Sequence, residues 1–321
     1  MIAIRVSTRR EEGRGHVARC EAVRGHLKLP VTWFVDPNCD VRPALRRGDL
    51  LEFEADAASI GTVRARSASC LAVLVDSYSI SGDAIADLSA LVPTLAFADT
   101  PPYPDADIVV APRLDVSSDG RIRGGAAYLP IAATFDAWRD CAGRKQVAGT
   151  TRVLVAFGGF DSTNRTELVL TALALAGPEF AITCALAPDA RHFDAVAARL
   201  AVLPGSRFAD PALPLVEAYA SNDIAIGAPG VSQAERAHCG LPTLLVPQNA
   251  TQVQLAAAWA ARKAALVAVA SVDEVAKGIG ALAEAPALRA AIRAAGLALV
   301  DGKGAARIAE ELMLLAQGQR R

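Results

Sequence analysis

The sequence lacks the features that mark membrane proteins, disordered chains and nucleic-acid binders. No apolar run reaches the roughly 18 residues that a membrane-spanning helix requires. Basic residues (33) and acidic residues (34) nearly cancel, which leaves a formal charge of −1, whereas a nucleic-acid-binding domain usually carries a basic excess. Hydrophobic residues make up 52% of the chain, and this content excludes a disordered protein.

Histidine is scarce, and the cysteines follow no metal-binding or disulfide pattern. The four histidines form no HxxxH or HExxH motif, and the six cysteines form no CxxC motif. We therefore expect no metal site, no cofactor and reduced thiols. The first residues, MIAIRVSTRREEG, place charges after a short apolar stretch, which is the reverse of a signal peptide. We expect a cytoplasmic protein, and we take a monomer as the working expectation.

Short apolar runs alternate with segments of helical periodicity, and this alternation predicts an α/β protein with parallel sheets. At 321 residues the chain is long enough for two domains. The expected strands are 2–6, 31–35, 70–75, 93–97, 107–111, 152–157, 181–186, 224–228, 242–247 and 266–270. The expected helices are 14–27, 82–91, 164–176, 189–201, 231–239, 251–263, 286–299 and 304–317. The last two helices either complete the second domain or fold back on the first.

A Gly-rich and polar stretch places the domain junction near 141–151, so we predict domains 1–145 and 146–321. Each domain opens with a strand, a glycine-bearing loop and a helix. Two doubly wound domains of this kind bind ligands at the carboxyl ends of their strands. The predicted architecture is therefore two Rossmann-like domains that face a cleft.

The first loop, Gly13-Arg14-Gly15-His16, places an imidazole at the start of a helix. An imidazole can accept a proton near neutral pH, and glycine allows close approach of the backbone to a ligand. The loop contains neither GxGxxG nor GK[ST], so it is not a dinucleotide fingerprint or a Walker A loop. Helix capping or packing by His16 is an equally good interpretation of this motif alone.

Two further loops point to an anion site in the second half of the chain. The loop 158–164, GGFDSTN, precedes a helix whose N–H groups favour anions, although capping by Ser162 or Asn164 explains it equally well. In the segment 227–235, Gly230 and Ser232 offer N–H and hydroxyl groups to phosphate, and Glu235 can accept from ribose hydroxyls. Local chemistry alone favours a capping box between Ser232 and Glu235.

Taken together, these motifs resemble the PseG-type UDP-sugar hydrolases, a branch of the GT-B architecture that includes MurG. The resemblance rests on their order along nearly the whole chain. The matching segments are Arg5 to Arg9, Gly13 to Cys20, Asp76-Ser77-Tyr78, Asp99, Asp107, GGFDSTNRT at 158–166, PGVSQAE at 229–235, and Gln252.

The resemblance implies hydrolysis of UDP-2,4-diacetamido-2,4,6-trideoxy-β-L-altropyranose to the free sugar and UDP, a step toward pseudaminic acid. His16 would be the catalytic residue that activates or positions the water. The expected UDP-sugar-binding residues are Arg5, Gly13, Gly15, Arg19, Asp76, Tyr78, Gly158, Gly159, Asp161, Asn164, Gly230, Ser232, Glu235 and Gln252. Of these, Gly158, Gly159 and Ser232 would hold the diphosphate together with neighbouring N–H groups, and Glu235 would hold the ribose. We expect no nucleic-acid partner and no membrane span.

Four positions depart from the family pattern: Ser7 replaces an Asp, Arg9 a Ser, Glu12 an apolar residue and Ser77 a His. We therefore expect the sugar-facing residues to differ more than the nucleotide-facing ones. Two other interpretations stay open. One is a GT-B glycosyltransferase that uses a sugar hydroxyl in place of water. The other is a non-catalytic sugar-nucleotide-binding protein of flagellin glycosylation.

Overall fold

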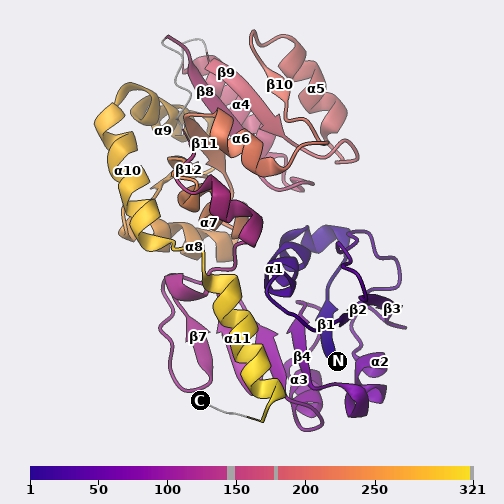
Figure 1. Cartoon of the computed structure of the whole chain (residues 1–321). Coiled ribbons are helices and arrows are strands. Elements are labelled where there is room, and N and C mark those ends of the chain that lie inside the picture. Colours follow the sequence, from indigo (N-terminus) through magenta and orange to yellow (C-terminus); the bar gives the residue numbers. More distant parts are fainter. Residues whose placement is uncertain (143–148, 177–179, 319–321) are drawn as a thin grey trace. The chain divides into compact units, whose positions relative to one another are not determined.

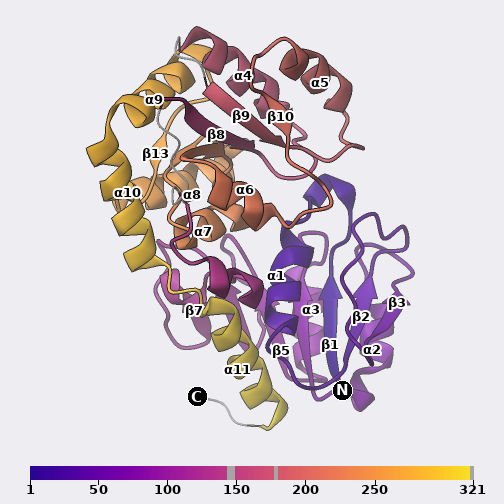
Figure 2. The ribbon, with the colours of Figure 1, turned by 45° about the horizontal axis from the view of Figure 1, so that its top comes forward.

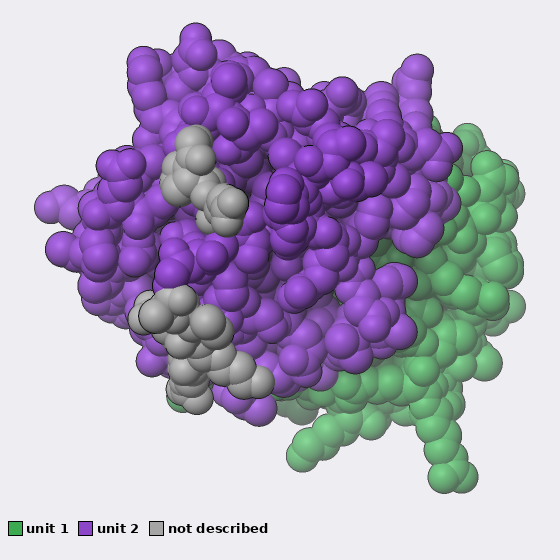
Figure 3. Space-filling model, turned by 90° about the horizontal axis from the view of Figure 1, so that it is seen from above, with its two compact units in different colours: residues 1–133, 302–321 green, residues 134–301 purple. Residues whose placement is uncertain are grey.

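The computed structural model describes residues 1–142, 149–176 and 180–318. The chain forms two compact units, which Figure 3 shows in different colours. Unit 1 consists of Met1–Ala133 and Gly302–Arg321, and unit 2 consists of Thr134–Asp301. The predicted junction at 145/146 lies outside the described residues.

Unit 1 is built on a seven-stranded sheet in the order β3-β2-β1-β4-β5-β6-β7, and every neighbouring pair is parallel. All residues of β1, β2, β4, β5 and β6 are buried, as expected for parallel strands covered on both faces. The strands are β1 (Ile2–Val6), β2 (Val31–Val35), β3 (Leu50–Phe53), β4 (Ala72–Asp76), β5 (Thr94–Phe97), β6 (Ile108–Ala111) and β7 (Ile122–Gly124).

The helices of unit 1 include one from the far end of the chain. Helix α11 packs against α1, β4, β5 and the short helix η3, and it lies alongside the unit 1 sheet in Figure 1. Its Glu311 accepts from Arg123 Nε at 2.6 Å and from the Tyr128 hydroxyl at 3.1 Å. The helices are α1 (Gly15–Arg24), α2 (Gly61–Ala65), α3 (Gly82–Ser89) and α11 (Gly304–Ala316), with the 3-10 segments η1 (Arg10–Glu12), η2 (Ser67–Ser69) and η3 (Ala126–Tyr128).

Of the two alternatives for residues 304–317, the structure shows the second, because α11 folds back on the first unit. The predicted domain 146–321 therefore includes a helix that groups with unit 1. The apolar side of α11 does not encode which sheet it covers. In the structure, α11 buries Ile308, Leu312 and Leu315 and pairs Glu311 with Arg123 of unit 1.

Gly304, the first residue of α11, lies against the backbone of Leu129, and this contact provides a test of the packing. A Cβ at Gly304 would overlap the Leu129 carbonyl oxygen and lie 2.6 Å from the carbonyl carbon. We expect Gly304→Ala to lower the unfolding free energy of unit 1 by about 1–3 kcal/mol, since overpacking forces backbone shifts. Gly82→Ala is the control, because its Cβ would meet only Pro104 Cα at 3.9 Å. Equal denaturation midpoints for the two variants would contradict this packing.

Unit 2 contains a six-stranded sheet in the order β10-β9-β8-β11-β12-β13, again with parallel pairs throughout. Its helices are seen around the sheet in the turned view of Figure 2. The strands are β8 (Thr151–Ala156), β9 (Phe180–Ala185), β10 (Arg207–Phe208), β11 (Ile224–Gly227), β12 (Thr243–Leu245) and β13 (Leu266–Val267). The helices are α4 (Arg165–Leu175), α5 (Phe193–Ala201), α6 (Leu215–Ser221), α7 (Val231–His238), α8 (Ala250–Ala261), α9 (Val272–Glu284) and α10 (Pro286–Leu299), with the 3-10 segment η4 (Ala133–Trp138) where the chain enters unit 2.

Each expected strand and helix has a counterpart within a few residues, so the predicted α/β class with parallel sheets is confirmed. Most of the missed elements are short or exposed, the three-residue strand β7 among them, whereas α9 has 13 residues and buries Val275, Ile279 and Leu282. The edge strand β3 leaves Leu50 and Phe53 exposed, and β10 has two residues. Helices α2, α6 and α9 were also missed. Among the described residues, no helix is both long and apolar enough to cross a membrane.

Candidate active site

Both sheets reverse their strand order at one point, and the predicted loops follow the strands at these points. In unit 1 the order reverses between β1 and β4, and in unit 2 between β8 and β11. Ligands of doubly wound sheets bind outside the carboxyl ends of the strands at such points. The loop with His16 follows β1, and the loops with Gly158 and Gly230 follow β8 and β11.

The chain between β1 and α1 turns sharply, and this turn positions His16. After η1, Gly13 adopts a φ of 77°, which is a left-handed conformation that glycine reaches without strain. Helix α1 then begins at Gly15, so His16 lies in its first turn. The imidazole is 3% exposed, and its position therefore depends on what its two ring nitrogens contact.

Asp76, the last residue of β4, lies at the centre of a buried polar cluster. Its Oδ1 lies 2.5 Å from His16 Nδ1 and accepts from Arg19 Nη2 at 2.6 Å, and its Oδ2 accepts from Arg19 Nε at 2.5 Å. Burial raises the pKa of this carboxyl, but the charges of Arg19 and His16 outweigh it and lower the pKa to about 2. The ionised carboxylate accepts a hydrogen bond from the Nδ1–H group, which leaves Nε2 as the nitrogen available for chemistry.

The Nε2 side of His16 faces Glu12 and Tyr78. Glu12 Oε2 lies 3.4 Å from Nε2, and the Tyr78 ring packs edge-on against the imidazole at 4.4 Å between centroids. Tyr78 is 63% exposed, so its ring offers an accessible surface beside His16. The sequence analysis noted Glu12 only as a departure from the family, although its spacing of four residues from His16 was a usable signal.

Asp99, just beyond β5, extends the cluster to a third strand end. It accepts from Arg19 Nη1 at 2.8 Å and from the Tyr78 hydroxyl. Burial raises the pKa of Asp99, but Arg19 and Tyr78 lower it below its usual value. Asp99 matched the family pattern without an assigned role, and the structure places it as the anchor of Tyr78.

Arg5 and Arg19 were predicted to bind substrate, and the structure shows what each guanidinium contacts. Arg5 is fully buried and donates to Asp36 Oδ1 at 2.6 Å, the Val6 carbonyl at 2.5 Å and the Ala57 carbonyl at 2.8 Å. Arg19 bonds Asp76 and Asp99 and covers the Phe97 ring at 4.6 Å. Both arginines therefore support the loops around His16, and direct substrate contact by them stays a prediction.

In unit 2, the loop after β8 caps its own helix. Asp161, at a φ of 38°, accepts from the N–H groups of Arg165 at 3.0 Å and Thr166 at 2.7 Å. The cap of α4 is thus Asp161, whereas the capping alternative named Ser162 or Asn164. Asn164 donates instead to Glu167 at 2.5 Å. Two N–H groups of α4 already have an anionic partner, so this helix is a weaker anion site than expected.

The loop after β8 is also held by Gln248 and Gln252, which follow β12. Gln252 Oε1 accepts from the Gln248 N–H at 2.9 Å, and Gln248 Nε2 donates to Asp161 Oδ1 at 3.0 Å. Gly158 adopts a φ of 86°, and a Cβ there would have no atom within 4 Å. The contact of Gln252 with substrate stays a prediction, while Gly158 leaves room for a ligand.

Helix α7 has an uncapped N-terminus. Its N-cap is Gly230, which has no side chain to cap the helix, so its first N–H groups are available to an anion. Ser232 is the second helical residue and not the N-cap, so the capping box with Glu235 does not form. Glu235 accepts from the Tyr219 hydroxyl at 2.9 Å, and burial raises the pKa of Glu235.

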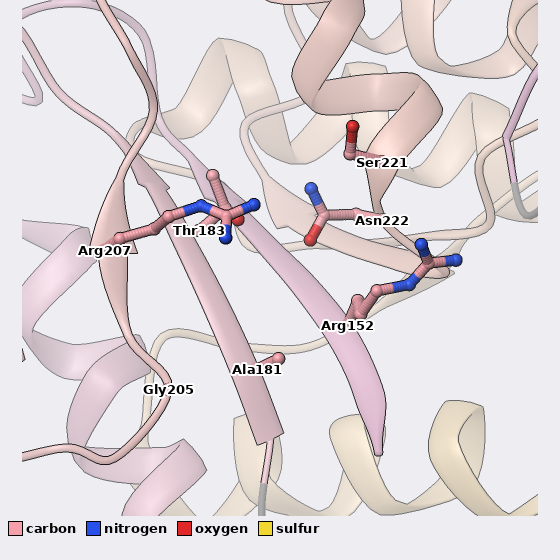
Figure 4. A pocket seen from close by; sticks show the side chains of 7 residues that line it. All are labelled: Arg152, Ala181, Thr183, Gly205, Arg207, Ser221 and Asn222. Atoms are coloured by element: carbon pink, nitrogen blue, oxygen red, sulfur yellow. The ribbon is translucent and has the colours of Figure 1, made fainter. Parts of the chain in front are cut away.

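A small pocket of unit 2 lies over the amino-terminal halves of β8 and β9, away from these loops. Figure 4 shows the seven side chains and backbone positions that line it. Its volume of about 60 Å³ has room for only a few water molecules. Arg152 at its rim is paired with Asp223 at 2.6 Å. The pocket is too small for a sugar nucleotide.

Comparisons with known proteins identify the fold. No protein-family model and no curated protein matches the sequence. Among solved structures, MurG of Acinetobacter baumannii is similar with a TM-score of 0.68 at 14% identity, over 97% of this chain and 99% of that one. The calicheamicin glycosyltransferase CalG4 gives 0.65 at 14% identity, over 98% of both chains. The UDP-GlcNAc 2-epimerase of Neisseria meningitidis, bound to UDP-GlcNAc, gives 0.61 at 14% identity, over 98% of this chain and 100% of that one. With its two parallel α/β sheets, the chain therefore has the GT-B fold.

Proposed function

We propose that this protein is an enzyme that hydrolyses a UDP-linked 2,4-diacetamido-2,4,6-trideoxy sugar to the free sugar and UDP. The observation that carries the proposal is the pairing of His16 Nδ1 with Asp76 Oδ1 at 2.5 Å. A carboxylate on one ring nitrogen orients the imidazole and favours its protonated form at the other. His16 is therefore built to take a proton through Nε2.

The reaction needs one positioned base and a stabilised leaving group. Water attacks the anomeric carbon, the new C–O bond forms, and the bond to the diphosphate breaks with its electron pair leaving on UDP. The proton of the water passes to His16 Nε2. Attack from the face opposite the leaving group inverts the anomeric centre. UDP is a good leaving group when N–H dipoles match its charge, so a second acid is not required.

Unit 2 supplies the features for the nucleotide part of the substrate. We assign the diphosphate to the open N-terminus of α7, at Gly230 and Ser232, with Gly158 and Gly159 beside it. We assign the ribose to Glu235, whose carboxylate is held by Tyr219. Of the similar solved structures, the N. meningitidis 2-epimerase is bound to UDP-GlcNAc, and MnaA of S. aureus is in complex with UDP. These complexes support a UDP-sugar as the substrate class.

Release of UDP from a panel of UDP-sugars without any acceptor tests the proposal. We expect the purified protein to release UDP from a UDP-linked diacetamido-trideoxy sugar, with inversion visible by NMR before the free sugar mutarotates. UDP-GlcNAc is the matched control, since it lacks the 4-acetamido and 6-deoxy groups.

Each outcome of this experiment has one meaning. Release only after addition of an acceptor sugar would favour a glycosyltransferase, which the similarity to MurG and CalG4 makes the second candidate. Tight binding without turnover of any UDP-sugar would contradict an enzyme and favour a sugar-nucleotide-binding protein.

A further inference from the structure

Glu12 is fixed in an unusual position for a surface-loop carboxylate. Its side chain is only 10% exposed, and its Oε1 accepts from the Ser79 hydroxyl at 2.8 Å. Its Oε2 accepts from the Tyr78 N–H at 3.4 Å and faces His16 Nε2 at 3.4 Å. These contacts hold the carboxylate against the ring nitrogen that the proposed reaction uses.

A proton that His16 accepts cannot leave through Nδ1, which faces Asp76. Asp76 is fully buried, and its oxygens accept from His16, from Arg19 twice and from the Cys20 thiol at 3.6 Å. A carboxylate with this many donors, paired with Arg19, remains ionised through the reaction. Any proton that His16 takes must therefore leave through Nε2, where Glu12 is the nearest carboxylate.

We propose that Glu12 is a positioning residue and proton partner of His16, and that the Glu12–His16 pair accepts the proton of the attacking water. This inference rests on the proposed hydrolysis. In the step, the O–H bond of water breaks as its oxygen bonds the anomeric carbon, and the proton resides between Nε2 and Oε2. It then passes from Glu12 to solvent, which restores the pair for the next turnover.

Several charged groups surround the Glu12–His16 pair. From η1 and its flank, Arg9 Nη1 lies 4.0 Å from Glu12 Oε1, and Arg9 also pairs with Glu11. From the strand ends, the groups are Asp76, Asp99, Arg19 and the Tyr78 hydroxyl. Among the charged groups of the described residues, only Glu12 contacts Nε2 directly, so its removal changes the pair while the rest of the cluster stays in place.

Carbethoxylation of His16 tests the pair without relying on turnover. Diethyl pyrocarbonate modifies uncharged imidazoles, and mass spectrometry follows each of the four histidines separately. We expect Glu12→Gln to raise the modification rate of His16 about tenfold, because the amide no longer holds a carboxylate against Nε2, which Glu12 Oε2 approaches to 3.4 Å. Glu11→Gln is the matched control and leaves the rate unchanged, and exposed His26 serves as the internal standard. Equal His16 rates in wild type and Glu12→Gln would overturn the pairing.

Kinetics of the same variants then test the role of the pair in the reaction. We expect Glu12→Gln to lower kcat about 10–100-fold at nearly constant KM. We also expect the acid limb of the pH profile, the fall of kcat at acidic pH, to move to lower pH. Glu12→Asp restores the wild-type position of that limb, whereas Glu11→Gln behaves as wild type throughout. If the wild type hydrolyses the substrate and Glu12→Gln has the same kcat as Glu11→Gln, the role of Glu12 is overturned, while the proposed hydrolysis stands. Absence of wild-type turnover on every UDP-sugar would contradict the proposed function, and the carbethoxylation rates would still decide whether Glu12 holds His16.

Discussion

Substitution of His16 by asparagine is expected to lower kcat for UDP release by about 10²–10⁴-fold, the usual contribution of a general base. Asparagine keeps a polar side chain of similar reach toward Asp76 but cannot take a proton from water. KM is expected to change little, because the nucleotide contacts assigned to unit 2 remain. Steady-state measurement of UDP release at several pH values checks this result, and the variant should lose the acid limb of the wild-type profile.

His26→Asn is the matched control for this substitution. His26 lies in the same unit directly after α1, but it is exposed, whereas His16 is buried. The control should retain wild-type kcat, and circular dichroism should show that both variants are folded. A folded His16→Asn protein that loses only a few-fold in kcat would remove His16 from its role as the base.

Substitution of Arg19 by methionine is expected to reduce the unfolding free energy of unit 1 by about 3–5 kcal/mol, since it leaves buried carboxylates without their cation. Arg19 bonds Asp76 at 2.5 Å and Asp99 at 2.8 Å. Methionine fills a similar volume over the Phe97 ring. A lower unfolding free energy would therefore come from the missing positive charge and not from a cavity. Denaturant unfolding of wild type and variant at pH 7 measures the difference.

Arg14→Met is the control, because Arg14, the N-cap residue of α1, is exposed, and its substitution should change stability by less than about 0.5 kcal/mol. Adding Asp76→Asn to Arg19→Met should recover part of the loss. A loss below about 1 kcal/mol in Arg19→Met would contradict an uncompensated buried charge.

The same cluster gives the stability a defined pH dependence. The pKa of Asp76 is about 2 in the folded protein, below its ordinary value of 3.8, so its stabilising contribution is present above about pH 4 and is lost as the pH falls toward 2. In the Arg19→Met variant, protonation of Asp76 also removes the negative charge that has lost its arginine partner. The stability difference between wild type and this variant should therefore shrink over the same interval.

The sequence by itself determined the α/β class, the succession of most strands and helices, and the three glycine-bearing loops. These features are local: apolar runs of strand length and helical periodicity require no knowledge of distant residues. The position of His16 in the first turn of α1 was likewise predictable, because Gly13 and Gly15 flank the turn that precedes it.

Only the tertiary structure decided which side chains meet. His16 and Asp76 are 60 residues apart, and Arg19 and Asp99 are 80 residues apart. They become neighbours because β1, β4 and β5 lie side by side in the sheet. The hydrogen bond of Glu235 to Tyr219, which are 16 residues apart, depends in the same way on packed helices. Strand order and side-chain geometry are properties of the whole fold, so no local pattern reveals them.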